Sequence, residues 1–245
     1  MIWVRSLLFT AAFYLYSTIC ALLMAPLLLG PRRWVSAALT LHGKGVVLLL
    51  RLIAGIRFEV RGLENLPAGA ALVAGKHHAF FDIFGSFTVM PSACFVLKKE
   101  LSWVPFVGWY ANKARMIVVD RSAHSAALRK LVRDAKDRFT EARQLVIFPE
   151  GTRKTPGDAP DYKPGIAALY RELEMPVVPM ALNTGCHWPA HGFKRYPGTI
   201  IFEFLPAIPA GLKRGEFMRE LENRLEAASD ALIAESAGKA SGRPA

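Results

Sequence analysis

The sequence predicts an α/β domain with a partly parallel central sheet flanked by helices, preceded by an N-terminal apolar helical membrane anchor. Three observations lead to this fold class. An uncharged run covers residues 6–30, short apolar runs alternate with longer amphipathic runs from Phe58 onward, and 52% of the residues are hydrophobic. Alternating strands and helices are typical of parallel sheets with helices on their faces. The high apolar content excludes an intrinsically disordered chain.

The first element is the uncharged run, which lies between Arg5 and Arg32. About 20 apolar residues suffice for a helix to cross the hydrocarbon of a bilayer, whereas a secretory signal has a shorter apolar core. A second apolar stretch, residues 46–56, is interrupted by Arg51 and is too short to cross alone. The two stretches predict either one crossing or a helical pair within one leaflet. A buried helical hairpin of a soluble protein is the remaining alternative.

Basic residues dominate the stretch that follows the first apolar run. Residues 31–61 hold six Lys or Arg and a single acid, Glu59, and the whole chain has a net charge of +11. The positive-inside rule then predicts the inner (cytoplasmic) membrane, with the domain that follows on the cytoplasmic side and anionic membrane lipids as partners. Nucleic acid is not expected as a partner, because it explains the charge but not the apolar run. We expect anchoring helices over 1–57, an α/β domain over 58–235 and a flexible tail over 236–245.

The body of the chain is assigned from its periodicity. In the longest amphipathic run, Leu128, Leu131, Val132, Ala135 and Phe139 recur at helical spacing. The short runs are continuously apolar, which is typical of buried parallel strands. Strands are predicted at 70–74, 94–97, 116–119, 145–148, 177–181 and 200–204, and helices at 122–142, 166–173 and 216–234.

An H-x4-D pair, His77 and Asp82, follows the predicted strand at 70–74. Five positions along one helix turn the side chain by about 140°. If the two side chains meet, His77 must therefore lie in the loop and Asp82 in the first helical turn. A neutral imidazole there can take a proton, while the carboxylate fixes its tautomer and stabilises the imidazolium. The alternative is a solvated histidine beside an aspartate that caps a helix.

A second polar segment, Phe-Pro-Glu-Gly-Thr-Arg at 148–153, follows the predicted strand at 145–148. Gly151 permits a tight turn with exposed amides, and the Arg153 guanidinium suits a phosphate. Lys163 precedes a helix start, where backbone amides also favour anions. Glu150 among these cations is either a member of the site or an orienting residue. The alternative for the whole segment is an ordinary turn with solvated charges. The predicted phosphate-binding residues in this part of the chain are Glu150, Gly151, Thr152, Arg153 and Lys163.

The H-x4-D pair followed by the 148–153 segment resembles the glycerolipid acyltransferases, specifically the lysophosphatidate acyltransferases. Residues 118–121, Val-Val-Asp-Arg, resemble the family's second block, whose arginine is assigned to glycerol phosphate, and this adds Arg121 to the set. Residues 177–181 resemble the fourth block, centred on a proline, and residues 98–101 with 105–108 resemble the segment between the first two blocks. The likeness covers about residues 60–204.

The resemblance implies acyl transfer from a thioester to the 2-hydroxyl of 1-acylglycerol-3-phosphate, which makes phosphatidic acid in phospholipid biosynthesis. The donor is acyl-CoA or an acyl-carrier protein and the acceptor a lysophospholipid, with no cofactor and no metal. His77 is the implied base and Asp82 its orienting partner. Because no Ser or Cys nucleophile motif is present, direct attack on the thioester is expected. Trp103, Phe106 and Trp109 line the acyl chain in this interpretation, or simply form core.

One departure keeps the acceptor open. The family often has Gln-Ser after the histidine, whereas this chain has His78 and Ala79. His78 is therefore a possible decoy for the base, and another lysolipid, such as lyso-ornithine lipid, is an alternative acceptor. A lipid hydrolase and a non-catalytic anionic-lipid-binding membrane protein are the more distant alternatives. The three cysteines have neither disulfide nor zinc spacing.

Overall fold

The fold is built on a seven-stranded mixed sheet with the strand order β1-β7-β6-β2-β5-β3-β4. The computed structural model describes residues 1–120, 122 and 124–241. Only the β6–β7 pair is antiparallel among the described strands, and all other neighbouring strands are parallel. The predicted fold class is thus confirmed. The strands are β1 Ile56–Arg61, β2 Ala71–Gly75, β3 Cys94–Lys98, β4 Ile117–Val119, β5 Gln144–Ile147, β6 Val177–Leu182 and β7 Gly198–Phe204.

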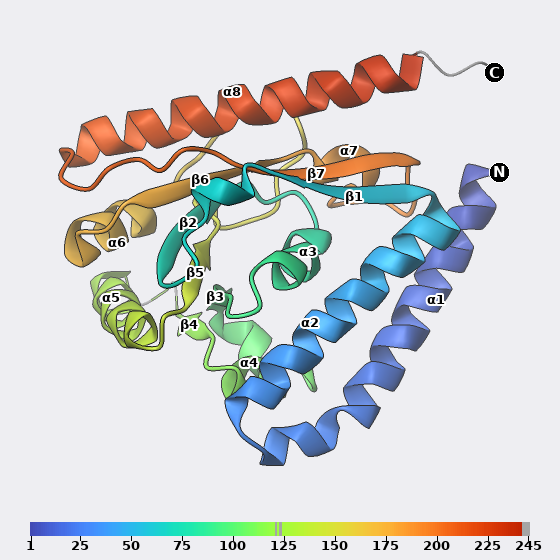
Figure 1. The fold of residues 1–245 in the computed structure, drawn as a ribbon, viewed down its shortest axis with the longest axis horizontal. Coiled ribbons are helices and arrows are strands. Elements are labelled where there is room, and N and C mark those ends of the chain that lie inside the picture. The colour runs from blue at the N-terminus through green and yellow to red at the C-terminus, as the bar shows by residue number, and fades with distance from the viewer. Residues whose placement is uncertain (121, 123, 242–245) are drawn as a thin grey trace.

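Helices cover both faces of this sheet. Figure 1 shows α8 above the sheet, with α3, α2 and α1 below it. The long α8 packs against β6 and β7, and α2 packs against α3. The α-helices are α1 Ile2–Leu23, α2 Arg32–Leu49, α3 Phe81–Val89, α4 Val107–Lys113, α5 His124–Thr140, α6 Gly165–Leu173, α7 Thr184–His187 and α8 Arg214–Ser241. The short helical segments are η1 Ala25–Leu29, η2 Leu50–Ala54, η3 Leu63–Asn65 and η4 Lys99–Trp103.

The differences from the predicted elements have physical reasons. The periodicity missed β1, because this edge strand alternates charged and apolar residues and was read as the end of an apolar stretch. It also missed α4 and α7, which are too short to show a helical period. The helix α8 continues to Ser241. The boundary expected at residue 235 is therefore too early for this helix, whose alanine-rich end retains helix propensity.

The arrangement of the central strands positions the site. Every residue of β2, β5 and β6 is buried, as expected for strands covered on both faces. Because β2, β5 and β3 run parallel as neighbours, their carboxyl ends meet at one edge of the sheet. In open α/β sheets this edge is where ligands bind.

The N-terminal helices form a hairpin beside the domain. Both α1 and the helical stretch Arg32–Ala54 are long and apolar enough to cross a membrane, which by itself is weak evidence for a membrane protein. A Cβ atom at Gly43 of α2 would lie 2.6 Å from the Phe84 carbonyl oxygen, so α2 lies directly against α3. The hydroxyl of Thr40 donates to the Phe87 carbonyl at 3.1 Å. The hairpin is therefore docked on the catalytic domain through α2.

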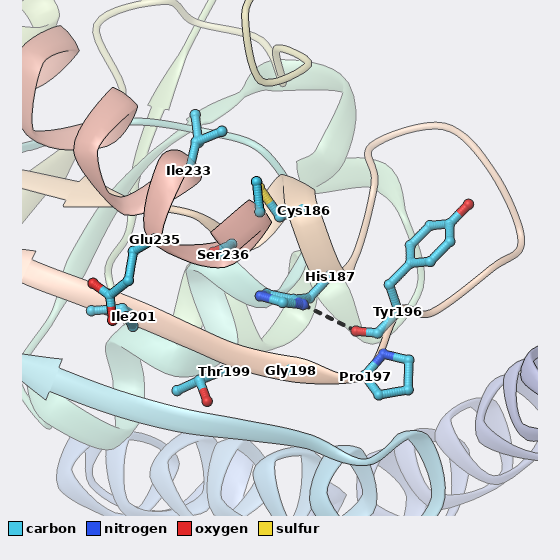
Figure 2. A pocket seen from close by; sticks show the side chains of 11 residues that line it. Cys186, His187, Tyr196, Pro197, Gly198, Thr199, Ile201, Ile233, Glu235 and Ser236 are labelled. Carbon is cyan, nitrogen blue, oxygen red and sulfur yellow. Dashed lines mark hydrogen bonds between the residues drawn. The ribbon is translucent and has the colours of Figure 1, made fainter. Parts of the chain in front are cut away.

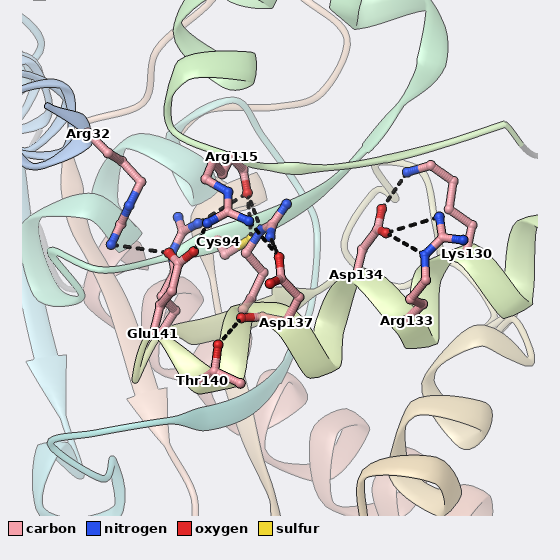
Figure 3. Close-up of polar contacts among 11 residues, drawn as sticks. Arg32, Cys94, Arg115, Lys130, Arg133, Asp134, Asp137, Thr140 and Glu141 are labelled. Carbon is pink, nitrogen blue, oxygen red and sulfur yellow. Dashed lines mark hydrogen bonds and ion pairs between the residues drawn. The ribbon is translucent and has the colours of Figure 1, made fainter. Parts of the chain in front are cut away.

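An ion pair and a hydrogen bond join the hairpin to the end of α5 and to α4. Arg32 at the start of α2 pairs with Glu141 after α5 at 3.2 Å (Figure 3). Arg115 also bonds Glu141 and reaches Asp137 at 2.6 Å. The Tyr110 hydroxyl on α4 donates to the Ala21 carbonyl of α1 at 2.9 Å. The hairpin, α4 and the end of α5 are thus held as neighbours.

Candidate active site

His77 and Asp82 meet as the spacing predicts. His77 lies in the loop after β2, and Asp82 is the second residue of α3. The His77 Nδ1 lies 2.8 Å from Asp82 Oδ2, and Asp82 is fully buried. Since a carboxylate only accepts, Nδ1 carries the hydrogen and Nε2 carries the lone pair that can take a proton.

One oxygen of Asp82 organises the whole loop. Oδ2 also accepts the backbone amides of His78 at 2.6 Å and Ala79 at 2.7 Å. Asp82 Oδ1 is buried and has no hydrogen-bond partner among the described residues. The aspartate therefore holds the loop before α3 and orients the His77 ring at the same time. It is not a helix cap, because the N-cap residue of α3 is Phe80 and no side chain of the described residues caps this helix.

The imidazole of His77 is clamped from its flat side as well. Its ring stacks on Phe148, which follows β5, with 4.1 Å between the centroids and an interplanar angle of 10°. The His77 side chain keeps 15% exposure, so the base is restrained but accessible. Restraint of this kind keeps a general base in a productive orientation.

The glycine turn after β5 lies against the same loop. Gly151 adopts a positive φ of 67°, and its amide donates to the Phe148 carbonyl at 2.9 Å. The Lys154 amide donates to the His77 carbonyl at 2.8 Å. The Arg153 guanidinium lies over the Phe80 ring at 4.3 Å from the centroid. The exposed Thr152 lies between these fixed points, so the turn and the base share one edge of the sheet.

Glu150 points into the protein instead of toward the turn's exposed side. It is 1% exposed, accepts from Lys76 Nζ at 2.6 Å, and lies 3.3 Å from the His77 amide. Lys76 also donates to Glu226 of α8 at 2.9 Å, and Glu226 accepts from Tyr162 at 2.7 Å. Burial lowers the pKa of the Lys76 ammonium, but the hydrogen bonds to the two carboxylates raise it above its usual value overall. This geometry fits the orienting alternative for Glu150.

Lys163 and Arg121 are the other two predicted cationic ligands of the phosphate. The Lys163 side chain is exposed and pairs with Asp161, while its amide donates to the Pro149 carbonyl at 2.8 Å. Arg121 lies outside the residues that the structure describes. Among the cationic predictions, Arg153 has the best-defined place beside His77.

The aromatic residues predicted for the acyl chain lie at the surface. Trp103 is 78% exposed and Trp109 52% exposed. Phe106 is partly buried, and its ring contacts Trp109 with 5.0 Å between centroids. Neither tryptophan is enclosed as a tunnel wall or a core residue would be. The hydrophobicity of these side chains favoured a buried position, but a sequence does not show which apolar residues the fold leaves at the surface.

Two cavities lie under α8, and no sequence pattern predicts either of them. The larger, of about 470 Å³, lies between α7, β7 and α8, where His187 Nδ1 and the Tyr196 carbonyl oxygen are 3.0 Å apart (Figure 2). The smaller, of about 230 Å³, is lined by Lys76, His78 and Glu226 among others. Lys76 and Glu226 are the network residues that sequence reasoning missed, because their pairing depends on how α8 docks.

The possible decoy His78 is excluded as the base by its surroundings. It is 1% exposed, and burial lowers its pKa from 6.5 to about 4. Since the folded-state value is the lower one, the unfolded chain takes up a proton first as the pH falls. The contribution of the neutral His78 side chain to the free energy of unfolding is therefore complete above pH 6.5 and is lost between pH 6.5 and about 4.

We therefore expect His78→Gln to make the free energy of unfolding less dependent on pH in the acid range, while the variant retains turnover at pH 7.5. Between pH 7.5 and pH 5, the wild type should lose about 1–2 kcal/mol more of its free energy of unfolding than the variant. Urea unfolding in detergent at the two pH values measures this difference. Equal losses in both proteins contradict the assigned burial effect, and loss of turnover in the variant contradicts the choice of His77.

Comparison with known proteins agrees with this geometry. A family model described as Acyltransferase matches residues 57–183. The chain is 37% identical to the 1-acyl-sn-glycerol-3-phosphate acyltransferase of Pseudomonas aeruginosa over 179 residues, which are 73% of this chain and 70% of that relative. It is 28% identical to the bovine 1-acyl-sn-glycerol-3-phosphate acyltransferase alpha over 69% of this chain and 60% of that relative.

A solved structure shares the fold. The crystal structure of the 1-acyl-sn-glycerophosphate (LPA) acyltransferase PlsC from Thermotoga maritima is similar with a TM-score of 0.80, over 96% of this chain and 98% of that chain. The sequences are 22% identical, so this similarity concerns the architecture. It includes the N-terminal hairpin, because so little of either chain is left unmatched.

Proposed function

Because this chain belongs to the acyltransferase family, we propose that it transfers a fatty acyl group from a thioester to the 2-hydroxyl of 1-acylglycerol-3-phosphate. The product is phosphatidic acid. The observation that carries the proposal is the oriented His77–Asp82 pair at the same sheet edge as the glycine turn and Arg153. The names of the Pseudomonas and bovine relatives, which are 1-acyl-sn-glycerol-3-phosphate acyltransferases, support this choice of acceptor.

The reaction is a direct displacement. Nε2 of His77 takes the proton of the acceptor hydroxyl as the oxygen attacks the thioester carbonyl. The tetrahedral intermediate collapses, the C–S bond breaks, and the imidazolium returns the proton to the leaving thiolate. The buried carboxylate of Asp82 stabilises the imidazolium during these steps. Backbone amides at the Gly151 turn are the proposed donors to the oxyanion.

Arg153 is the proposed ligand of the acceptor phosphate. Its guanidinium lies over Phe80 of the loop that carries the base, and its fork can bind two phosphate oxygens. Arg121 and Lys163 remain proposed contributors, while Glu150 is assigned to orienting the loop through Lys76 and the His77 amide.

We expect Arg153→Ala to raise the KM for lysophosphatidate by about 10- to 100-fold, because a charge-assisted phosphate contact of about 1.5–3 kcal/mol is lost. The value of kcat should change less, since the contact exists in both ground and transition states. Initial rates over a range of acceptor concentrations measure both constants. Arg171→Ala, which removes an exposed arginine of α6, is the matched control. An unchanged dependence on acceptor concentration contradicts the phosphate role.

The hairpin is the proposed membrane anchor, and its docking favours a helical pair within one leaflet. The helix α2 is packed along α3 of the catalytic domain, which a single crossing away from the domain does not explain. The apolar surface of α1 is largely exposed and suits lipid contact. A site at the interface avoids moving acyl chains into water at about 0.8 kcal/mol per CH₂. We keep the cytoplasmic side of the inner membrane as the proposed location, from the basic residues at 31–61.

A panel of acceptors tests the substrate assignment. Lysophosphatidate, lyso-ornithine lipid and an uncharged monoacylglycerol are compared in the same vesicles with an acyl-CoA or an acyl-carrier protein as donor. The proposal predicts the highest kcat/KM for lysophosphatidate, and a preference for lyso-ornithine lipid contradicts it. The donor comparison identifies which thioester the enzyme takes.

A further inference from the structure

An exposed apolar surface on the catalytic domain has no part in the chemistry proposed above. It is formed by the segment 101–109, from the end of η4 into α4, and is called here the η4–α4 patch. Five of its large apolar side chains are at least 40% exposed. They are Leu101 at 40%, Trp103 at 78%, Val104 at 41%, Val107 at 49% and Trp109 at 52%. Such contiguous exposure on one short segment marks an interaction site.

The segment is held in this outward conformation by its own backbone. A Cβ atom at Gly108 would lie 2.0 Å from the Ser102 carbonyl oxygen, so the two turns are in close contact. The Gly108 amide donates to the Val104 carbonyl at 2.8 Å, and the Ser102 hydroxyl donates to the Lys99 carbonyl at 2.6 Å. Phe106 has a φ of 63°, which is strained for a residue with a side chain. Strain of this kind persists where a conformation serves a function.

The η4–α4 patch continues the apolar surface of the N-terminal hairpin. The helix α4 contacts both η1 and α2, and Tyr110 bonds the Ala21 carbonyl of α1. At this end of the hairpin, Leu23 is 75% exposed, Leu29 91% and Trp34 47%. The tip of the hairpin and the patch thus offer one apolar surface from two parts of the chain.

Charge and location agree with a lipid surface. The patch is flanked in sequence by Lys98, Lys99, Lys113 and Arg115, with Glu100 the single acid between them. Lys99 pairs with Asp120, and Arg115 pairs with Asp137 and Glu141, so the unbalanced positive charge beside the patch comes from Lys98 and Lys113. Basic residues beside apolar ones favour an anionic bilayer, and tryptophan favours the level of the lipid headgroups. The segment begins at the carboxyl end of β3, the sheet edge that also carries His77.

We propose that the η4–α4 patch is a second membrane contact, which inserts into the headgroup region of an anionic bilayer beside the hairpin tip. The patch then holds the edge with His77 at the lipid surface, where an acceptor in the membrane can reach it by lateral diffusion. This inference rests on the proposed membrane function of the hairpin. It commits to lipid as the occupant and not to a protein or to the substrate's acyl chain.

Tryptophan quenching in vesicles tests the contact without any assay of activity. The chain has five tryptophans, and replacing four of them by Phe leaves a full-length protein with Trp103 alone. This protein is reconstituted in vesicles of phosphatidylcholine and phosphatidylglycerol that carry brominated acyl chains. The matched control has all five replaced and Glu216→Trp added on the exposed face of α8, across the sheet from the hairpin.

The inference predicts that brominated lipid quenches Trp103 at least several-fold more than the α8 tryptophan, while aqueous acrylamide shows the reverse order. Equal responses of the two proteins overturn it. Protection of Trp103 from both quenchers also overturns it, because a protein partner or a second copy then covers the patch. These outcomes do not depend on which acceptor the enzyme uses, so they separate this inference from the proposed reaction.

A kinetic comparison tests the consequence for substrate access. Trp103→Ala with Trp109→Ala should lower the ratio of activity on vesicle-embedded lysophosphatidate to activity on a short-chain soluble analogue about tenfold. The control is Leu63→Ala, which removes an exposed leucine outside the patch. An unchanged ratio with both activities reduced assigns the tryptophans to the substrate's acyl chain and overturns the inference.

Discussion

Replacing His77 by Ala is expected to lower kcat by about 10³–10⁴-fold, because no described group takes over its proton transfer. The imidazole is the group whose Nδ1 is held by Asp82 and whose ring is stacked on Phe148. The variant removes the base but leaves the Asp82 bonds to the two loop amides in place. Initial rates of thioester consumption with saturating lysophosphatidate measure the effect.

Two controls belong to this experiment. His191→Ala removes an exposed histidine outside the site and should retain wild-type kcat. Circular dichroism and vesicle flotation should show that His77→Ala keeps its fold and its membrane association. Wild-type turnover in a folded His77→Ala protein contradicts the assignment of the base.

The second large effect concerns Asp82, for which Asn and Ala should behave differently. One oxygen of Asp82 accepts all three bonds, from His77, His78 and Ala79. The carbonyl oxygen of an asparagine can take the same position, so the tautomer and the loop are kept while the charge is lost. We expect Asp82→Asn to lower kcat by about 10- to 100-fold. The free energy of unfolding should fall by about 1–3 kcal/mol, because the asparagine NH₂ then lies at the buried Oδ1 position, which has no partner among the described residues.

Asp82→Ala should affect stability as well. It leaves the two buried amides unsatisfied at a cost of about 1–3 kcal/mol each, and it frees the His77 ring. The expected kcat loss is about 10³-fold, larger than for Asn. Steady-state rates and urea unfolding of the three proteins measure the two effects. Wild-type kcat in Asp82→Asn, with a destabilised but active Ala variant, contradicts the catalytic role and leaves only a structural role in holding the loop before α3.

The central pair was predictable from the sequence because its geometry is local. A buried strand ends at Gly75, and α3 begins at Phe81, so the spacing leaves few ways to place His77 and Asp82. The buried apolar runs also predict parallel strands, but the strand order is seen only in the structure. The same reasoning predicted the tight turn at Gly151, whose positive φ the structure shows.

Other features depend on tertiary contacts that periodicity does not report. Glu150 pairs with Lys76 because β5 lies beside β2, and α8 brings Glu226 to the same ammonium from far along the chain. Trp103 is exposed because a close turn at Gly108 presents it outward, although its hydrophobicity predicts burial. Arg121 stays a prediction, since it lies outside the described residues. The sequence also does not predict that all three donors of the loop bond Asp82 Oδ2 and that Oδ1 is buried without a partner among the described residues.

The most direct test of the central claim is the release of thiol from an acyl thioester by the purified enzyme, with and without lysophosphatidate. The reaction proposed here predicts release that depends on the acceptor, that matches the phosphatidic acid formed, and that is lost in His77→Ala. Release at the same rate without acceptor contradicts acyl transfer and indicates a hydrolase. The absence of release under both conditions contradicts the enzymatic account and leaves a lipid-binding protein.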